Sequence, residues 1–174
     1  MHEDLFSQAE ALARLDALKP KQVNLRRAVS SAYYAVYHYL VHEVCCVQIG
    51  TSHAQASYRN VLARAFTHNI MKQACSSFGG GTLKDTAIKG LPRDSSGRYP
   101  VHHAIRTLAL TFVSLQEKRH LADYDRSERF NRADVLTLIE RAKNDVLAFA
   151  ALAMSDDKKF FLACLWAWKE LANR

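Results

Sequence analysis

A stripe of apolar residues over 101–122 is the feature that most constrains how this chain can fold. At about 100° per residue, Arg119 falls in the middle of the stripe and Asp123 lies one turn further along it. A guanidinium and a carboxylate are therefore predicted at positions where the pattern calls for core residues. The apolar members recur at steps of three, four and seven positions, which places them on one face of an α-helix; they are Val101, Ile105, Leu108, Phe112, Leu115 and Ala122.

Burying the Arg119 and Asp123 side chains is costly unless the two charges are paired and hydrogen-bonded. One interpretation is a structural ion pair, joined by Arg27 and Tyr34 from the helix predicted over 21–47. The other is that the pair belongs to a functional site, where charges are often placed against the pattern of the core. The residues alone leave both interpretations open.

Helical spacing also accounts for the rest of the chain. Pro20 and Gly50 separate the first three helices, Pro100 suits the first turn of the helix over 101–124, and Ser155 suits an N-cap. We find no strand pattern, repeat or second domain. The prediction is an all-α, up-and-down bundle of five to six helices that forms one domain over 1–174. Besides the helix over 101–124, helices are expected over 3–18, 21–47, 52–76, 133–153 and 156–172. The apolar stripe of the first consists of Leu5, Leu12, Leu15 and Leu18, and that of the 52–76 helix consists of Tyr58, Leu62, Phe66 and Ile70.

The segment 77–100 differs from these helices because it holds five of the six glycines and two of the three prolines. Such a composition predicts a long loop, inserted in the bundle, with one helical turn near Leu83 to Ile88. The loop is either a flexible basic arm or a solvated surface loop; its charged residues are Lys84, Lys89, Arg93 and Arg98 against Asp85 and Asp94.

Charge and composition restrict the classes of partner and compartment. Lys and Arg total 24 against 17 Asp and Glu, which gives a net charge of +7 and permits binding to nucleic acid or another acidic partner. No apolar stretch of about 18 residues is free of charge, so no transmembrane helix is expected. There is no basic region followed by an apolar run at the start, and the four cysteines lack a CxxC spacing. A cytoplasmic protein with reduced thiols and no membrane partner is predicted.

The face of the 21–47 helix that lies opposite its apolar stripe is unusual for a solvated surface. It carries Arg27, Ser31, Tyr34 and His38 at steps of four, three and four, with His42 nearby. Ser, Tyr and His suit polar contacts with another helix or a second subunit, and an ordinary solvated face is the alternative. His38 and His42 have the spacing of a metal pair, but no third ligand follows, and the Glu of a zinc protease helix is absent. No metal or cofactor is predicted.

Two separated segments resemble one family. RRAVSSAYYAVYHYL (residues 26–40) is similar to the Arg…Ser-x-Ala-Tyr-Tyr-Ala…His helix of bacterial HEPN domains, and LQEKRHLADYD (residues 115–125) resembles their Arg-x-x-Ala-Asp-Tyr segment. The resemblance covers most of the chain except 77–100. It implies an α-helical bundle, commonly dimeric, of a kind in which many members are metal-independent ribonucleases. These act in toxin–antitoxin and antiviral systems, often beside a nucleotidyltransferase-like partner.

The resemblance also implies a site, from which this chain departs. Active members carry an Arg, usually a polar residue next, and a His four to six residues after the Arg, where the Arg stabilises phosphate charge and the His assists proton transfer at the 2′-hydroxyl. Arg119 and His120 match the first two positions, but Tyr124 stands where a His is expected and His120 is the last histidine in the chain. A phenol is a poor base at neutral pH, and His120 points about 100° away from Arg119 on an ideal helix.

Three hypotheses follow. The first is a HEPN-type protein with a degenerate nuclease motif, which acts with RNA, a nucleotide or a partner protein in a toxin–antitoxin or defence setting. It forms a homodimer through the helices over 21–47 and 101–124, and Asp123, Arg27, Tyr34 and His38 support the site. The second is an active ribonuclease toxin whose variant site consists of Arg119, His120 and Tyr124 across a dimer. The third is a sensor that binds a nucleotide or another small molecule between the same two helices.

Overall fold

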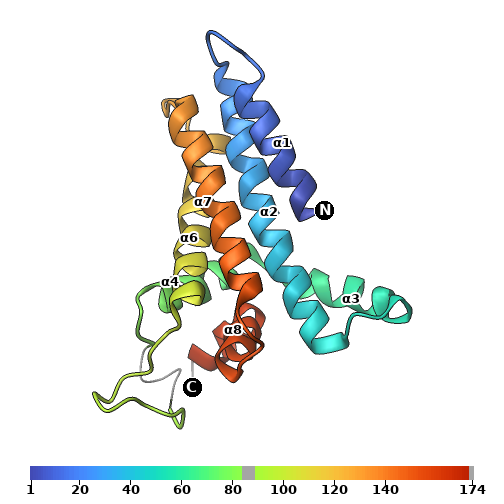
Figure 1. The fold of residues 1–174 in the computed structure, drawn as a ribbon, viewed down its shortest axis with the longest axis vertical. Helices are drawn as coiled ribbons and strands as arrows, with labels where there is room; N and C mark the ends of the chain where they lie inside the picture. The colour runs from blue at the N-terminus through green and yellow to red at the C-terminus, as the bar shows by residue number, and fades with distance from the viewer. Residues whose placement is uncertain (84–88, 173–174) are drawn as a thin grey trace. The chain divides into compact units, whose positions relative to one another are not determined.

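Helices make up all the regular elements in the part of the chain that the computed structural model describes, residues 1–83 and 89–172 (Figure 1). No β-strand occurs in these residues, so the predicted all-α class is confirmed. The helices are α1 (His2–Arg14), α2 (Gln22–Ile49), α3 (Ala56–Leu62), α4 (His68–Gly79), α6 (His103–Tyr124), α7 (Arg132–Ala151) and α8 (Asp156–Ala172), with two short 3-10 helices, η1 (His53–Gln55) and η2 (Ala63–Ala65).

The chain divides into two compact units. Unit 1 comprises Met1–Tyr39 and Thr111–Leu147, and unit 2 comprises Leu40–Leu110 and Ala148–Arg174. The helices α2, α6 and α7 each contribute residues to both units. The assignment of the whole chain to a single domain stays a prediction.

Unit 1 is a bundle of α1, α7 and the adjoining parts of α2 and α6, and these helices lie side by side in Figure 1. Short connections make α1 antiparallel to α2 and α6 antiparallel to α7, as predicted for an up-and-down bundle. Side-chain contacts link the helices in a closed ring: Gln8 with Ser31 joins α1 to α2, Tyr33 with Phe112 joins α2 to α6, Thr111 with Asp145 joins α6 to α7, and Lys143 with Glu10 joins α7 to α1.

The core of unit 1 confirms the predicted apolar faces of α2 and α6. The predicted stripe of α2 is buried over its first half, and the part of the α6 stripe that belongs to unit 1 is also buried. The residues concerned are Leu25, Val29, Ala32, Tyr33 and Val36 on α2, and Phe112, Leu115 and Ala122 on α6.

Unit 2 has its own core, in which α4 packs against α8. The Phe78 ring of α4 lies edge-on to the Phe161 ring of α8, with 4.9 Å between centroids, and also contacts the rings of Phe160 and Trp168. Phe149, at the end of α7, packs against Phe161 from another side at 5.7 Å. Ser155 caps α8 as predicted, since its hydroxyl accepts a hydrogen bond from the Lys158 N–H. No helix of the described residues is long and apolar enough to cross a membrane.

The first helix is shorter than predicted. It ends at Arg14 rather than near residue 18, because the Asp16 carboxylate accepts hydrogen bonds from the Lys21 N–H (3.0 Å) and the Asn24 side chain (2.8 Å) and so closes a turn. Its buried residues are Phe6, Ala9 and Ala13, whereas Leu15 and Leu18, which were predicted to be part of the stripe, are exposed.

The helix predicted over 52–76 is interrupted. Phe66 and Thr67 have extended backbones, and the Thr67 hydroxyl accepts a hydrogen bond from the Ile70 N–H, so it caps a new helix, α4. Phe66 is buried as the apolar spine requires, but Tyr58 is exposed. A second boundary also differs: α6 begins at His103, and Pro100 pairs with Thr82 in an isolated bridge instead of opening the helix.

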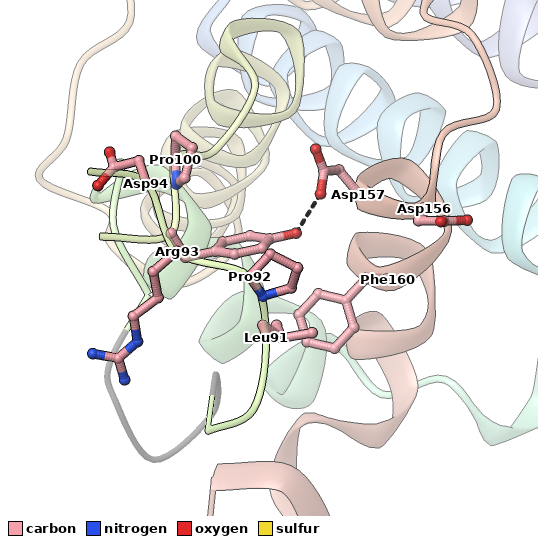
Figure 2. A pocket seen from close by; sticks show the side chains of 9 residues that line it. Leu91, Pro92, Arg93, Asp94, Pro100, Asp156, Asp157 and Phe160 are labelled. Atoms are coloured by element: carbon pink, nitrogen blue, oxygen red, sulfur yellow. Dashed lines mark hydrogen bonds between the residues drawn. The ribbon is translucent and has the colours of Figure 1, made fainter. Parts of the chain in front are cut away.

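Part of the 77–100 loop is anchored to α8. The Tyr99 side chain is buried, and its hydroxyl donates a hydrogen bond of 2.6 Å to Asp157 at the start of α8 (Figure 2). The Asp94 carboxylate accepts hydrogen bonds from the Ser96 and Arg98 N–H groups and fixes a turn. This part of the loop is therefore folded on unit 2 rather than a free arm. The helical turn predicted near Leu83 to Ile88 falls on 84–88, which lie outside the described residues.

Candidate functional site

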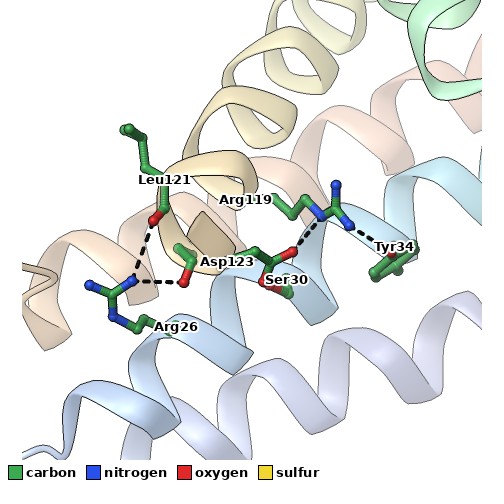
Figure 3. A network of polar contacts seen from close by, with 7 residues as sticks. Arg26, Ser30, Tyr34, Arg119, Leu121 and Asp123 are labelled. Atoms are coloured by element: carbon green, nitrogen blue, oxygen red, sulfur yellow. Dashed lines mark hydrogen bonds and ion pairs between the residues drawn. The ribbon is translucent and has the colours of Figure 1, made fainter. Parts of the chain in front are cut away.

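The predicted pair of Arg119 and Asp123 links the end of α6 to α2 in unit 1. Arg119 Nε lies 2.7 Å from Asp123 Oδ2, and each side chain is 21% exposed. The other carboxylate oxygen, Oδ1, accepts a hydrogen bond of 2.9 Å from the hydroxyl of Ser30, which is itself buried (Figure 3). Arg119 Nη2 donates a bond of 3.1 Å to the Tyr34 hydroxyl. The carboxylate therefore has a partner on each oxygen, and Tyr34 joins the pair as predicted.

Aromatic rings of α2 also face the Arg119 guanidinium. Its Cζ lies 5.9 Å from the centroid of the Tyr33 ring and 5.6 Å from that of the Tyr34 ring. These distances suit cation–π attraction, which is stronger for a partly desolvated cation. Because Asp123, Tyr34 and the two rings all engage the guanidinium, the pair has the geometry of an interhelix contact.

The arginine that reaches the end of α6 is Arg26, not Arg27. The guanidinium of Arg26 acts as a cap for the helix, because the last carbonyls of a helix have no partner within it. Arg27, which was predicted to support the pair, is exposed. The carbonyl oxygens that accept hydrogen bonds from Arg26 are those of Leu121 (3.3 Å), Ala122 (2.7 Å), Asp125 (2.8 Å) and Glu128 (2.7 Å). Figure 3 shows the bond to Leu121.

The other predicted site residues lie apart from the guanidinium contacts. His120 and Tyr124 are exposed on α6, one turn apart, and their ring centroids are 4.9 Å from each other. His38 is half-buried on α2 and stacks on the Tyr34 ring at 6.2 Å. Burial lowers the pKa of His38, so the neutral imidazole is favoured. Arg119, Asp123 and Tyr34 thus form one group, which His38 touches through Tyr34, while His120 and Tyr124 form a second.

Among residues 1–83 and 89–172, no three or more His, Cys, Asp or Glu side chains are arranged to hold a metal ion. His42 and Cys46 on α2 approach each other, with 3.4 Å between Nε2 and Sγ. All four cysteines are free thiols, as predicted. Burial raises the pKa of Cys164 to about 12 and raises that of Cys75 as well, which keeps these two thiols protonated.

A depression in unit 2 lies between the 91–100 segment and the start of α8 (Figure 2). Its volume is about 630 Å³. Two of its carboxylates already have partners, since Asp157 accepts from Tyr99 and Asp156 pairs with Lys159. The lining residues are Leu91, Pro92, Arg93, Asp94, Tyr99, Pro100, Asp156, Asp157 and Phe160.

Sequence reasoning missed Arg26 and Ser30, although a signal for both was present. Arg26, Ser30 and Tyr34 recur at steps of four and so share one face of α2, and all three contact the end of α6. The prediction had instead used Arg27 and Ser31, one position further along the helix.

Comparisons with models of protein families, with curated proteins and with solved structures give no match to this chain. The resemblance to HEPN domains therefore stays a prediction.

Proposed function

We propose that the chain is a HEPN-type helical protein that binds RNA without cleaving it, as part of a toxin–antitoxin or defence system. The observation that carries the proposal is the engagement of Arg119. This residue of the RHLADYD segment is suited to binding phosphate, yet Asp123 and Tyr34 hold its guanidinium against α2.

The chemistry of RNA cleavage supports a role without catalysis. A metal-independent ribonuclease needs a group that moves the 2′-hydroxyl proton and a cation beside the same phosphate. Arg119 faces α2 and is paired with a carboxylate, whereas His120 and Tyr124 contact one another on the exposed part of α6. No histidine follows Arg119 at the spacing expected of active HEPN domains. The net charge of +7 still favours association with a polyanion.

The proposal includes a homodimer that forms through α2 and α6, and a nucleotidyltransferase-like partner protein. The resemblance supports both, and the exposed Arg27 on α2 and Tyr124 on α6 leave polar and aromatic surface for a second copy. Light scattering on the purified chain measures its mass, and the mass of a monomer at all concentrations would contradict the dimer.

The deciding experiment incubates total cellular RNA in EDTA with the wild type, with Arg119→Ala and with Lys118→Ala as the exposed neighbouring control. We expect no cleavage by any of the three. RNA binding by the wild type, measured as fluorescence anisotropy, should weaken as salt rises, because counterions are released when phosphates are neutralised. Cleavage by the wild type and by Lys118→Ala, but not by a folded Arg119→Ala, would overturn the proposal.

One observation favours an active ribonuclease as the second candidate function. His120 and Tyr124 form an exposed pair beside Arg119 in the sequence, so an acid–base group and a phenol are open to a substrate. This function predicts growth arrest when the wild type is expressed and relief by His120→Ala or Arg119→Ala in a protein that stays folded. Harmless expression of the wild type at good yield would contradict it.

A further inference from the structure

The α3 helix of unit 2 covers no core. None of its side chains is buried, and two of its three large apolar residues, Tyr58 and Val61, are 67% and 64% exposed. With Ile49, Ser57 and Leu62 they line an open groove of about 650 Å³ between the end of α2 and α3. Together these residues form a contiguous exposed apolar surface, of the kind that marks interaction sites in proteins.

Hydrogen bonds, rather than apolar packing, hold α3 in place. The chain leaves α2 through Gly50, whose φ of +101° is one that glycine adopts without strain. Arg59 of α3 reaches back, and its Nη1 donates to the Gly50 carbonyl (2.7 Å) and the Ser52 carbonyl (2.9 Å). These two bonds tether α3 to the end of α2 while its apolar residues remain open to solvent.

The segment that forms most of this groove is basic. Residues 44–83 contain no Asp or Glu, and they carry Arg59, Arg64 and Lys72. Unit 2 as a whole holds twelve Lys and Arg against six Asp and Glu, whereas unit 1 holds twelve against eleven. Most of the excess positive charge therefore belongs to unit 2. In Figure 1, α3 stands away from α8, which carries the acidic pair at its start.

We propose that α3 is a binding surface for unpaired RNA, with a base stacked on Tyr58 in the groove and phosphates paired with Arg64 and its basic neighbours. This inference rests on the proposed function and assigns it a place in the molecule. Base stacking on an exposed aromatic residue beside basic side chains is how proteins bind single strands, and paired bases are not available for it. The exposed Asn60 amide adds a group that can bond to base edges.

An acidic helix from a protein partner fits this surface less well than RNA does. Helices that dock on a helix need apolar anchors over two or more turns. The groove offers Tyr58, Val61 and Leu62 from a helix of only 7 residues, so it accommodates a base or two but gives a docked helix little to pack against. The absence of carboxylates over 44–83 favours the binding of an acidic helix and of RNA alike, so charge does not distinguish the two partners.

The test measures the anisotropy of a labelled single-stranded RNA and of a duplex of the same sequence with the full chain. The variants are Tyr58→Ala, Tyr58→Phe and Arg64→Ala, with Arg14→Ala on α1 of unit 1 as the exposed basic control. We expect Tyr58→Ala to weaken single-strand binding by about 10-fold and Tyr58→Phe to change it less than about 2-fold, since a phenyl ring still stacks. Arg64→Ala should lower the salt dependence by about one phosphate contact. Because Tyr58 is exposed, melting of Tyr58→Ala should match the wild type.

The outcomes separate this inference from the proposed function. If the wild type binds RNA and Tyr58→Ala binds it equally well, α3 is not the binding surface, but the proposed function stands. Binding of the duplex as tightly as of the single strand would also overturn stacking on Tyr58. If the wild type binds no RNA, the proposed function itself fails. Loss of binding in Tyr58→Ala alone, with recovery in Tyr58→Phe, would support the inference.

Discussion

The ends of α6 and α7 are capped by the same means in different surroundings. In unit 1, the Arg26 guanidinium donates to four carbonyl oxygens at and after the end of α6. In unit 2, the Lys158 ammonium donates to the Phe149 carbonyl (2.9 Å) and the Leu152 carbonyl (3.0 Å) at the end of α7. Arg26 is partly exposed, whereas Lys158 is only 2% exposed and its Nζ lies 4.6 Å from the centre of the Phe149 ring.

The difference shows how burial sets the value of a cap. A guanidinium has five donors in a fixed plane and can serve several carbonyls at once, whereas an ammonium is a point charge that serves fewer. Water can replace Arg26 at a partly exposed helix end, but it has little access to the Lys158 position. An acceptor left unpaired in a buried place costs more than one that water reaches. We therefore expect the smaller network, that of Lys158, to be the more important for stability.

The largest effect is expected from Lys158→Ala, which should lower the free energy of unfolding by about 3 kcal/mol. The substitution removes both hydrogen bonds of the ammonium, to the Phe149 and Leu152 carbonyls, and its contact with the Phe149 ring, and it leaves a gap at a buried position. Urea denaturation followed by circular dichroism measures the change. The control is Lys159→Ala, since Lys159 is 53% exposed in its ion pair with Asp156 and its loss should cost less than about 0.5 kcal/mol. Equal losses for the two substitutions would contradict the expectation that burial makes the Lys158 cap important for stability.

Arg26→Ala should cost about 2 kcal/mol, less than Lys158→Ala although it removes more hydrogen bonds, because water can reach the freed carbonyls. The neighbouring Arg27→Ala is the matched control and should leave stability within about 0.5 kcal/mol of the wild type. The same urea titration serves both. A larger loss for Arg26→Ala than for Lys158→Ala would show that the number of bonds, not their burial, decides the value of a cap.

Asp123→Ala extends the comparison of buried and exposed polar contacts to the ion pair of Arg119 and Asp123 on α6. A fully buried ion pair would lose about 3–5 kcal/mol when one partner is removed. Because the Arg119 and Asp123 side chains are 21% exposed, we expect a loss nearer 1.5 kcal/mol. A thermal melt measures it, and an unchanged melting temperature would exclude a structural role for the pair.

The smallest effect is a pH dependence that only the buried cap should show. Burial lowers the pKa of Lys158 from its usual value of 10.5. Between the lowered native pKa and 10.5, the unfolded chain binds more protons at this position than the native chain, so stability rises with pH. The stability of the wild type relative to Lys158→Ala should therefore increase between neutral pH and pH 10 by less than about 1 kcal/mol. Paired urea titrations across this range test it, and a decrease would contradict the burial of a charged Lys158.

The long helices were predictable because their apolar residues recur with the period of an α-helix. The stripe of α6 is buried from Ile105 to Ala122 as predicted, although Val101 lies outside the helix. Arg119 and Asp123 pair with each other, and Arg119 contacts Tyr34, as predicted, but neither charged side chain is buried in the core. The break at Thr67 was missed because a single hydroxyl cap overrode an otherwise continuous helical spacing.

Other features could not be read from spacing. Arg26 and Arg27 are neighbours about 100° apart on α2, and the rotation of α2 against α6 decides which of them reaches the end of that helix. Lys158 gave no signal because its partners are backbone carbonyls, which carry no sequence pattern. Tyr58 has the spacing of a core residue, and only the interruption of its helix leaves it exposed.

Because α3 buries no side chain, it can unfold locally while the rest of unit 2 stays intact. Its amide hydrogens then exchange with solvent through a small opening, far below the free energy needed to open α4 and α8. Mutations at Tyr58 and Val61 carry almost no penalty for folding, so natural variation can reshape this surface while the bundles are kept. A protein built in this way can change what it recognises without first having to regain its stability.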